Sequence, residues 1–168
     1  SCHRGTLAST KVLADLGYKV ELVHVDTETN REVARAQAEK AINEGAGAIV
    51  GAFESGQTLA IAQVCEQRKV PLVINVAAAP NITQQGYQYL VRNFPTGGAL
   101  VTNGLKLINE VAKAANVEFK TAAFLHANDT FGTGQRQAMD AIFPKLNMPF
   151  QLVESIAYDP KAQDLSVE

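Results

Sequence analysis

The chain has 168 residues, of which 46% are hydrophobic and 19% are charged. This composition is typical of a globular protein and excludes a disordered or fibrous chain. Fifteen basic and seventeen acidic residues leave a net charge of −2, so we expect no nucleic acid among the partners. No apolar run approaches the ~20 residues of a membrane span, and the two cysteines make neither a disulfide framework nor a metal site.

Segments with the pattern of strands and helices alternate through the first half of the chain. Thr29-Asn30-Arg31-Glu32 is a capping box, and Gly17 and Gly45 have the character of residues that end helices. These signals and the apolar periodicity predict helices over residues 7–16, 32–42 and 57–68, a short helical turn over 82–85, and strands over 19–25, 48–50, 72–75 and 89–93.

The second half repeats the alternation. It predicts helices over 100–115 and 135–146, strands over 121–126 and 151–156, and the start of another helix at Asp164-Leu165-Ser166. Strands separated by helices imply parallel sheets flanked by helices, an α/β fold. The Pro/Gly cluster over residues 94–98 indicates a crossing between two lobes, so we predict one lobe over residues 1–94 and the beginning of a second over 95–168.

Small residues follow two of the predicted strands. One strand ends at Gly51 and leads to Ser55, where a helix begins, and the next opens into Ala77-Ala78-Ala79. Two parallel strands that end side by side would present backbone N–H groups and a hydroxyl to a small anion. The alternative role for Ser55 is a plain helix N-cap. The alanines favour a ligand site, because small side chains let a ligand approach the backbone.

Other site chemistries fit the sequence less well. The glycines of Gly45-Ala46-Gly47 precede a strand, whereas a dinucleotide fingerprint follows one. Ser55 lies in no Gly-x-Ser-x-Gly elbow, and we interpret the loop after His126 as a helix cap made by Asn128, Asp129 or Thr130. We therefore expect no enzyme activity and no cofactor.

Several segments occur in the same order in a known family. They are Asp26-Thr27, the 32–42 helix, Ile49-Val50-Gly51 with Ser55, Ala77-Ala78-Ala79-Pro80, the segment 82–87, Val91-Arg92-Asn93, and Asn128-Asp129-Thr130-Phe131-Gly132. From about Gly17 onward the chain resembles the periplasmic solute-binding proteins of ABC importers, of the leucine/isoleucine/valine-binding type. The resemblance implies a two-lobed type I periplasmic-binding-protein fold, present here only in part, so we expect a fragment of a longer protein.

The resemblance also implies roles for individual residues. Ser55 takes the place of the family's carboxylate-binding serine, Val76, Ala77 and Ala78 form the next ligand loop, Phe53 and Glu54 flank the serine, and Phe131 lines the pocket from the second lobe. The implied partners are a small carboxylate ligand and a membrane permease, and the implied location is extracytoplasmic. A ligand-sensing domain of a receptor or regulator with the same fold is the alternative function.

One position departs from the family's pattern. Ala78 replaces a threonine that in amino-acid binders helps to hold the α-amino group. Removing a hydroxyl from a site built for a polar group can cost orders of magnitude in discrimination. We therefore expect a carboxylic acid without an α-amine, such as an aromatic acid, with branched-chain amino acids as the alternative.

Overall fold

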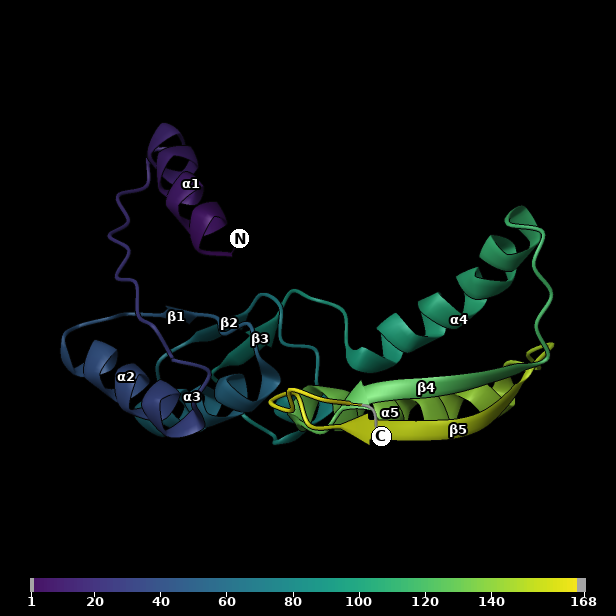
Figure 1. The fold of residues 1–168 in the computed structure, drawn as a ribbon. Helices are drawn as coiled ribbons and strands as arrows, with labels where there is room; N and C mark the ends of the chain where they lie inside the picture. The colour runs from purple at the N-terminus through teal and green to yellow at the C-terminus, as the bar shows by residue number, and fades with distance from the viewer. Residues whose placement is uncertain (1, 166–168) are drawn as a thin grey trace.

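The computed structural model describes residues 2–165, in which helices alternate with parallel strands (Figure 1). This confirms the α/β class. The α-helices are α1 (Cys2–Asp15), α2 (Arg31–Asn43), α3 (Ser55–Arg68), α4 (Gly97–Ala114) and α5 (Thr130–Ile142). The strands are β1 (Ile49–Val50), β2 (Leu72–Ile74), β3 (Leu90–Arg92), β4 (Thr121–Ala127) and β5 (Gln151–Tyr158), and two 3-10 helices are η1 (Pro80–Gln84) and η2 (Phe143–Lys145).

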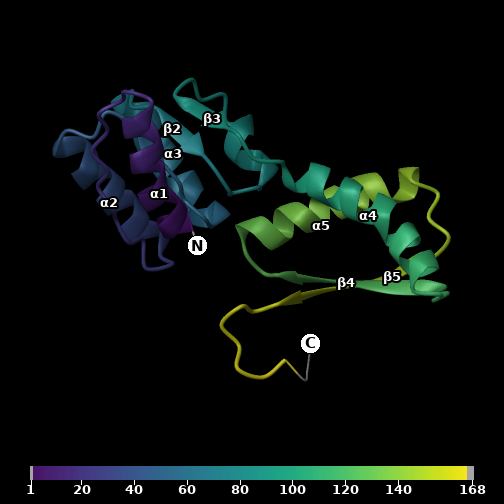
Figure 2. The same ribbon diagram turned by 90° about the horizontal axis from the view of Figure 1, so that it is seen from above.

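The described strands form two separate parallel sheets. The first has the order β1-β2-β3, with Ile49 opposite Leu72 and Leu72 opposite Leu90. The second is the pair β4-β5, in which Thr121 lies opposite Gln151. Figure 2 shows the two sheets at opposite ends of the molecule. The division of the chain into residues 1–94 and 95–168 stays a prediction.

The first core lies between the β1-β2-β3 sheet and the helices α2 and α3. Its buried members are apolar side chains from both layers: Ala34, Ala38, Ile61, Ala62, Val64, Cys65, Leu72, Ile74, Ala77, Ala79 and Ile82. Alanines at positions 34 and 38 stand one helical turn apart on α2. Their small side chains let α2 pack closely on α3, since residues four apart share one face of a helix.

The second core lies between the β4-β5 pair and the helices α4 and α5. Val101 and Leu105 from α4 meet Met139 from α5 and Phe150 just before β5. Phe150 also packs against Phe119 and Phe143, with ring centroids 4.8 and 5.6 Å away. Figure 1 shows α5 behind the β4-β5 pair, so one face of this pair is covered and the other is open.

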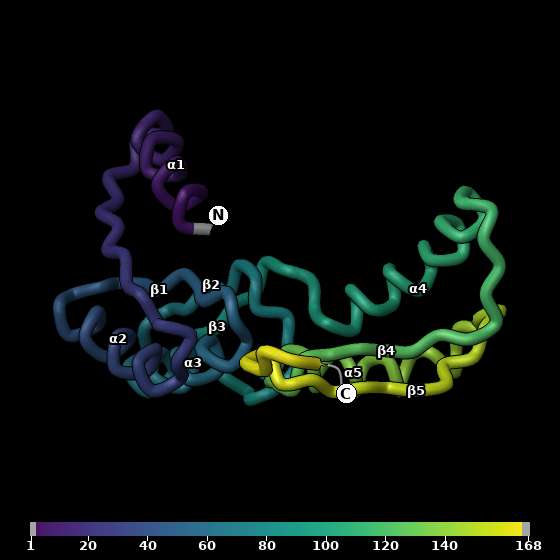
Figure 3. Tube along the Cα trace, in the orientation of Figure 1, coloured from purple at the N-terminus to yellow at the C-terminus, as the bar shows by residue number. Residues whose placement is uncertain are grey.

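The predicted strand over residues 19–25 is wrong, because these residues form no strand in the structure. Along the trace in Figure 3, they run as an extended segment between α1, which stands apart from the first sheet, and α2. The residues Val20, Val23 and Val25 are exposed. The alternating pattern predicted an extended backbone, but a strand also needs a neighbour for its N–H and C=O groups, and no described strand pairs with this segment.

Several helices begin at a different residue from the one predicted. Asn30 is the N-cap of α2, and its side chain accepts hydrogen bonds from the N–H groups of Glu32 and Val33. Thr96 caps α4 at Gly97, so the crossing between the halves is shorter than the predicted 94–98 segment. Asp129 caps α5, as one of the three expected candidates. These caps place the helix starts earlier than apolar periodicity alone indicated.

The C-terminal part of the described chain contains no further helix. Asp164 and Leu165 are not helical, and Ser166, the third residue of the expected helix start, lies outside the described residues. Within residues 2–165 no helix has the length and apolar character needed to cross a membrane.

Candidate functional site

The candidate site begins where β1 leads into α3. Ser55 is the first residue of α3, and Glu54 is the N-cap, whose side chain makes no capping hydrogen bond. Thr58 holds this turn instead, because its Oγ1 accepts from the Ala52 N–H at 3.1 Å and donates to the Glu54 carbonyl at 2.8 Å. The hydroxyl of Ser55 is therefore not needed to cap its own helix, and the plain N-cap interpretation is wrong.

The Ser55 hydroxyl is directed at the loop that follows β2. The N–H of Ala79 donates to Ser55 Oγ at 3.2 Å, and Ser55, Ala77, Ala78 and Ala79 are all buried. Because Ser55 Oγ acts as the acceptor in this bond, its own hydrogen remains to be donated. The structure thus brings Ser55 and the alanine loop together, as expected from two parallel strands that end at one edge.

The other predicted site residues lie around this contact at different depths. Val76 is half-buried in the same loop, and Glu54 is half-buried with its carboxylate accepting from the Gln57 side-chain amide. The side chain of Phe53 is 67% exposed and that of Phe131 is 41% exposed. Phe53 lines a broad groove along residues 19–27 and 45–53, so the structure does not place the two aromatic rings at the Ser55–Ala79 contact.

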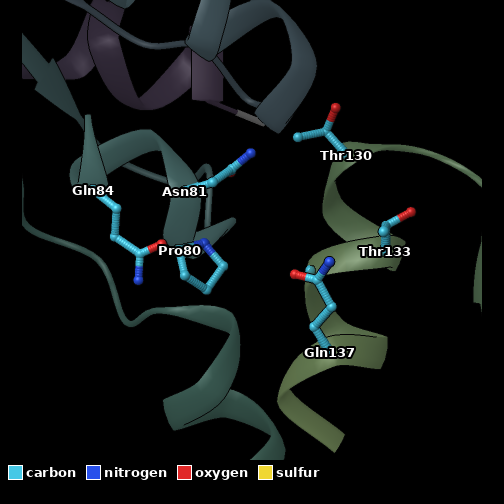
Figure 4. Close-up of a pocket in the computed structure, with 7 residues that line it drawn as sticks. Pro80, Asn81, Gln84, Thr130, Thr133 and Gln137 are labelled. Atoms are coloured by element: carbon cyan, nitrogen blue, oxygen red, sulfur yellow. The ribbon is translucent and has the colours of Figure 1, made fainter. Parts of the chain in front are cut away.

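A cavity of about 300 Å³ lies next to the alanine loop, between η1 and the first turns of α5 (Figure 4). Asn81 and Gln84 line it from η1, and Thr130, Thr133 and Gln137 line it from α5. These side chains are uncharged donors and acceptors, which suit the hydroxyl and carbonyl groups of a small polar molecule.

None of these cavity residues was predicted from the sequence as a site residue. The available signal was the spacing of Thr130, Thr133 and Gln137, which places three polar side chains on one face of a helix directly after a strand. The signal was missed because the predicted helix started at Gln135 rather than at Thr130.

The two halves of the molecule touch beside this cavity. A Cβ atom added at Gly134 of α5 would lie 3.3 Å from Pro80 Cδ and 3.8 Å from Ala79, and the Arg31 guanidinium donates to Thr130 Oγ1. Ser55 itself is 2% exposed. The neighbouring segments therefore shield the Ser55 side chain from solvent.

The electrostatics of the site come from the backbone and from one carboxylate. Ser55 stands at the N-terminal end of α3, where the helix dipole favours an anion. Glu54 already supplies one negative charge there, and its bond to Gln57 holds that charge in place. In the described part of the chain, no three His, Cys, Asp or Glu side chains gather closely enough to hold a metal ion.

Comparison with known proteins assigns this chain to a family. A family model described as periplasmic binding protein matches residues 6–168. The Leu/Ile/Val-binding protein of Escherichia coli (strain K12) is 25% identical over 123 residues, which cover 73% of this chain and 32% of that protein. The chain thus spans about a third of the length of this curated relative.

Solved structures agree with the sequence comparison. A leucine-binding protein from Thermotoga maritima is 27% identical with a TM-score of 0.72, covering 90% of this chain and 41% of that one. An ABC-transporter solute-binding protein from R. palustris, in complex with 4-hydroxybenzoate, is 25% identical with a TM-score of 0.74 over 90% and 41% of the two chains. The match of the family model over nearly the whole sequence decides the assignment. The chain belongs to the periplasmic binding protein family.

Proposed function

We propose that the chain is part of the extracytoplasmic solute-binding component of an ABC importer. It captures a small carboxylate between two α/β lobes and presents it to a membrane permease. The observation that carries the proposal is the Ser55–Ala79 contact, which joins a hydroxyl to a backbone amide where β1 and β2 end. Membership of a family of solute-binding proteins, which is not a family of enzymes, supports transport over catalysis.

In this proposal Ser55 anchors the carboxylate, and the backbone of Val76, Ala77 and Ala78 completes the polar surroundings. Phe53 and Phe131 supply apolar walls, and Glu54 flanks the anchor. The burial of Ser55 agrees with a site that closes over its ligand, as hinged two-domain binding proteins do.

The class of ligand follows from the residue at position 78. The E. coli relative is named for leucine, isoleucine and valine, and the R. palustris protein holds 4-hydroxybenzoate. Each of these ligands carries a carboxylate, but only the amino acids carry an α-ammonium group. Because Ala78 offers no hydroxyl, we favour a carboxylic acid without an α-amine, such as an aromatic acid, and keep branched-chain amino acids as the alternative.

Isothermal titration calorimetry of the full-length protein tests both steps. We expect binding of 4-hydroxybenzoate and no binding of its methyl ester, which has the same ring but no carboxylate. Tight binding of leucine with no response to aromatic acids would eliminate the aromatic ligand. Failure of both leucine and 4-hydroxybenzoate to bind would eliminate the proposed carboxylate site.

A further inference from the structure

Arg92 is a charged residue inside the first half of the molecule that the proposed site does not use. It is the last residue of β3 and is half-buried. Its Nη2 donates to the Ala79 carbonyl at 2.7 Å, and its Nη1 donates to Thr83 Oγ1 at 3.3 Å. No described carboxylate forms a salt bridge with it. Partial burial of a charged arginine that has no carboxylate partner costs free energy. The position of Arg92 against the loop therefore calls for a structural explanation.

The loop held by Arg92 is the one that bonds to Ser55. Ala79 accepts from Arg92 through its carbonyl and donates to Ser55 Oγ through its N–H. On the other side, the Gly97 N–H donates to the Ala78 carbonyl at 2.7 Å. The Ala78 carbonyl and the Ala79 N–H belong to one peptide group, so a bond accepted at one end strengthens the bond donated at the other.

We propose that Arg92 is a positioning residue for the ligand-binding serine. Arg92 holds the Ala79 carbonyl and the Gly97 amide holds the Ala78 carbonyl, so Ala79 is fixed by hydrogen bonds on both of its peptide groups. Ser55 Oγ is then occupied as an acceptor by the Ala79 N–H, and its hydroxyl hydrogen is directed to the ligand carboxylate. This inference rests on the proposed function. It also links the serine to the crossing between the halves, because residues 92 and 97 stand at the two ends of that crossing.

The geometry of the guanidinium explains why arginine occupies this position. Two nitrogens of one plane reach a carbonyl and a hydroxyl in different directions, whereas lysine offers a single charged nitrogen. Burial lowers the pKa of Arg92, but an arginine stays cationic at neutral pH. Its Nε is buried and has no hydrogen-bond partner among the described residues. The guanidinium therefore bears a desolvation cost that its two hydrogen bonds do not remove.

A double-mutant cycle in the full-length protein, with 4-hydroxybenzoate and leucine as calorimetric probes, tests the inference. We expect Arg92→Met to weaken binding about tenfold and Arg92→Lys to weaken it less, since loss of a hydrogen bond to a charged group costs about that much. When Ser55→Ala is already present, Arg92→Met should weaken binding no further, because Arg92 acts through Ser55. Arg35→Met, which removes an exposed arginine paired with Glu39, is the matched control.

A second pair of variants tests the hydrogen bond from the Gly97 N–H to the Ala78 carbonyl without changing Arg92. Proline is accepted at the first position of a helix, and Thr96 already has the extended backbone that precedes proline, with φ −72° and ψ 159°. Gly97→Pro removes the N–H that bonds to Ala78 and puts its Cδ against the Ala78 carbonyl oxygen, which must move away. Gly97→Ala keeps the N–H with ordinary contacts at 3.5 Å or more. We expect the proline variant alone to weaken binding.

The outcomes separate the inference from the proposed function. If wild-type protein binds a probe and the losses from Arg92→Met and Ser55→Ala multiply in the double variant, Arg92 does not act through the serine and the inference is overturned. Equal affinity of the Gly97→Pro and Gly97→Ala variants would also overturn it. If wild-type protein binds neither probe, the proposed function fails and the inference fails with it.

Discussion

At the residue scale, the loop that we propose to bind the ligand has an alanine at position 78. Ala78 is buried beside the Ser55–Ala79 contact, and its methyl group can neither donate nor accept a hydrogen bond. A threonine here would add a hydroxyl to the loop at the cost of some crowding, since an added group in a packed site costs ~1–3 kcal/mol.

We predict that Ala78→Thr raises the affinity for leucine relative to 4-hydroxybenzoate by about tenfold, because an amino acid gains a partner for its ammonium group. Competition binding of the two ligands to the full-length protein measures the ratio. Ala77→Thr is the control, since it adds the same atoms to the neighbouring buried residue. An equal change in the ratio for both variants would contradict a specific role for position 78.

Gly132 is a second residue whose identity the structure requires. It stands in the first turn of α5, where the chain has just turned back from β4. A Cβ atom at this position would lie 1.9 Å from the Ala127 carbonyl oxygen and 2.9 Å from its nitrogen. Both are backbone atoms of β4, so the collision can be relieved only by moving the helix away from the sheet.

We predict that Gly132→Ala lowers the free energy of unfolding by about 3 kcal/mol, at the upper end of the usual cost of overpacking. Gly104→Ala is the matched control, because Gly104 lies inside α4 with no atom within 4 Å of an added Cβ. That variant should gain about 1 kcal/mol from helix propensity. Urea unfolding monitored by circular dichroism measures both, and similar stabilities for the two variants would refute the close approach.

At the scale of single elements, α3 carries a buried thiol on the face that packs against the first sheet. Cys65 is 1% exposed and belongs to the first core. Burial raises its pKa to about 11, above the ~8.5 of an exposed cysteine. The folded state therefore keeps the thiol protonated in a pH range where the unfolded state ionises.

This difference predicts how stability depends on pH. The contribution of Cys65 is fully present below about pH 8.5 and is lost as pH rises through about 11. Between pH 8 and pH 10 the loss should reach about 2 kcal/mol. At each pH, the free energy of unfolding of a Cys65→Ala variant is subtracted from that of the wild type. The difference removes the contribution of the other titrating groups. A pH-independent difference between wild type and variant would show that Cys65 is not the cause.

The elements also show which parts of the fold were predictable from the sequence. The strands β1, β2, β3, β4 and β5 were predicted because each has an apolar pattern in the sequence. Each of them also has a paired neighbour in the structure. The 19–25 segment has the same pattern but no described strand beside it. The alternation of apolar and polar side chains indicates which face of a strand is apolar. The pairing of that strand depends on segments that are far away in the sequence.

The candidate site was predictable to a similar extent. The Ser55–Ala79 contact followed from two small-residue loops after neighbouring strands, because parallel strands end at one edge. The cavity side chains of α5 and the Arg92 contact with Ala79 could not be inferred in the same way. Both depend on how side chains and backbone of different elements meet, and no local pattern specifies that geometry.

At the scale of the whole molecule, the open face of the β4-β5 pair is an apolar surface without a cover among the described residues. The α5 helix covers the other face, where Phe124 and Leu152 join the second core. On the open face Leu125 and Val153 are each 61% exposed. Exposed apolar side chains on a two-stranded sheet favour contact with another chain or another segment.

We predict that the 168-residue chain, expressed by itself, self-associates through this face. Sedimentation should show species larger than the monomer, and the dye ANS should bind. Replacing Leu125 and Val153 by threonine keeps good strand propensity while removing the apolar surface, so the double variant should be more nearly monomeric. Ala123→Thr with Gln151→Thr changes two other exposed positions of the same strands and should leave association unchanged. A wild-type chain that is monomeric at all concentrations would show that this face needs no partner.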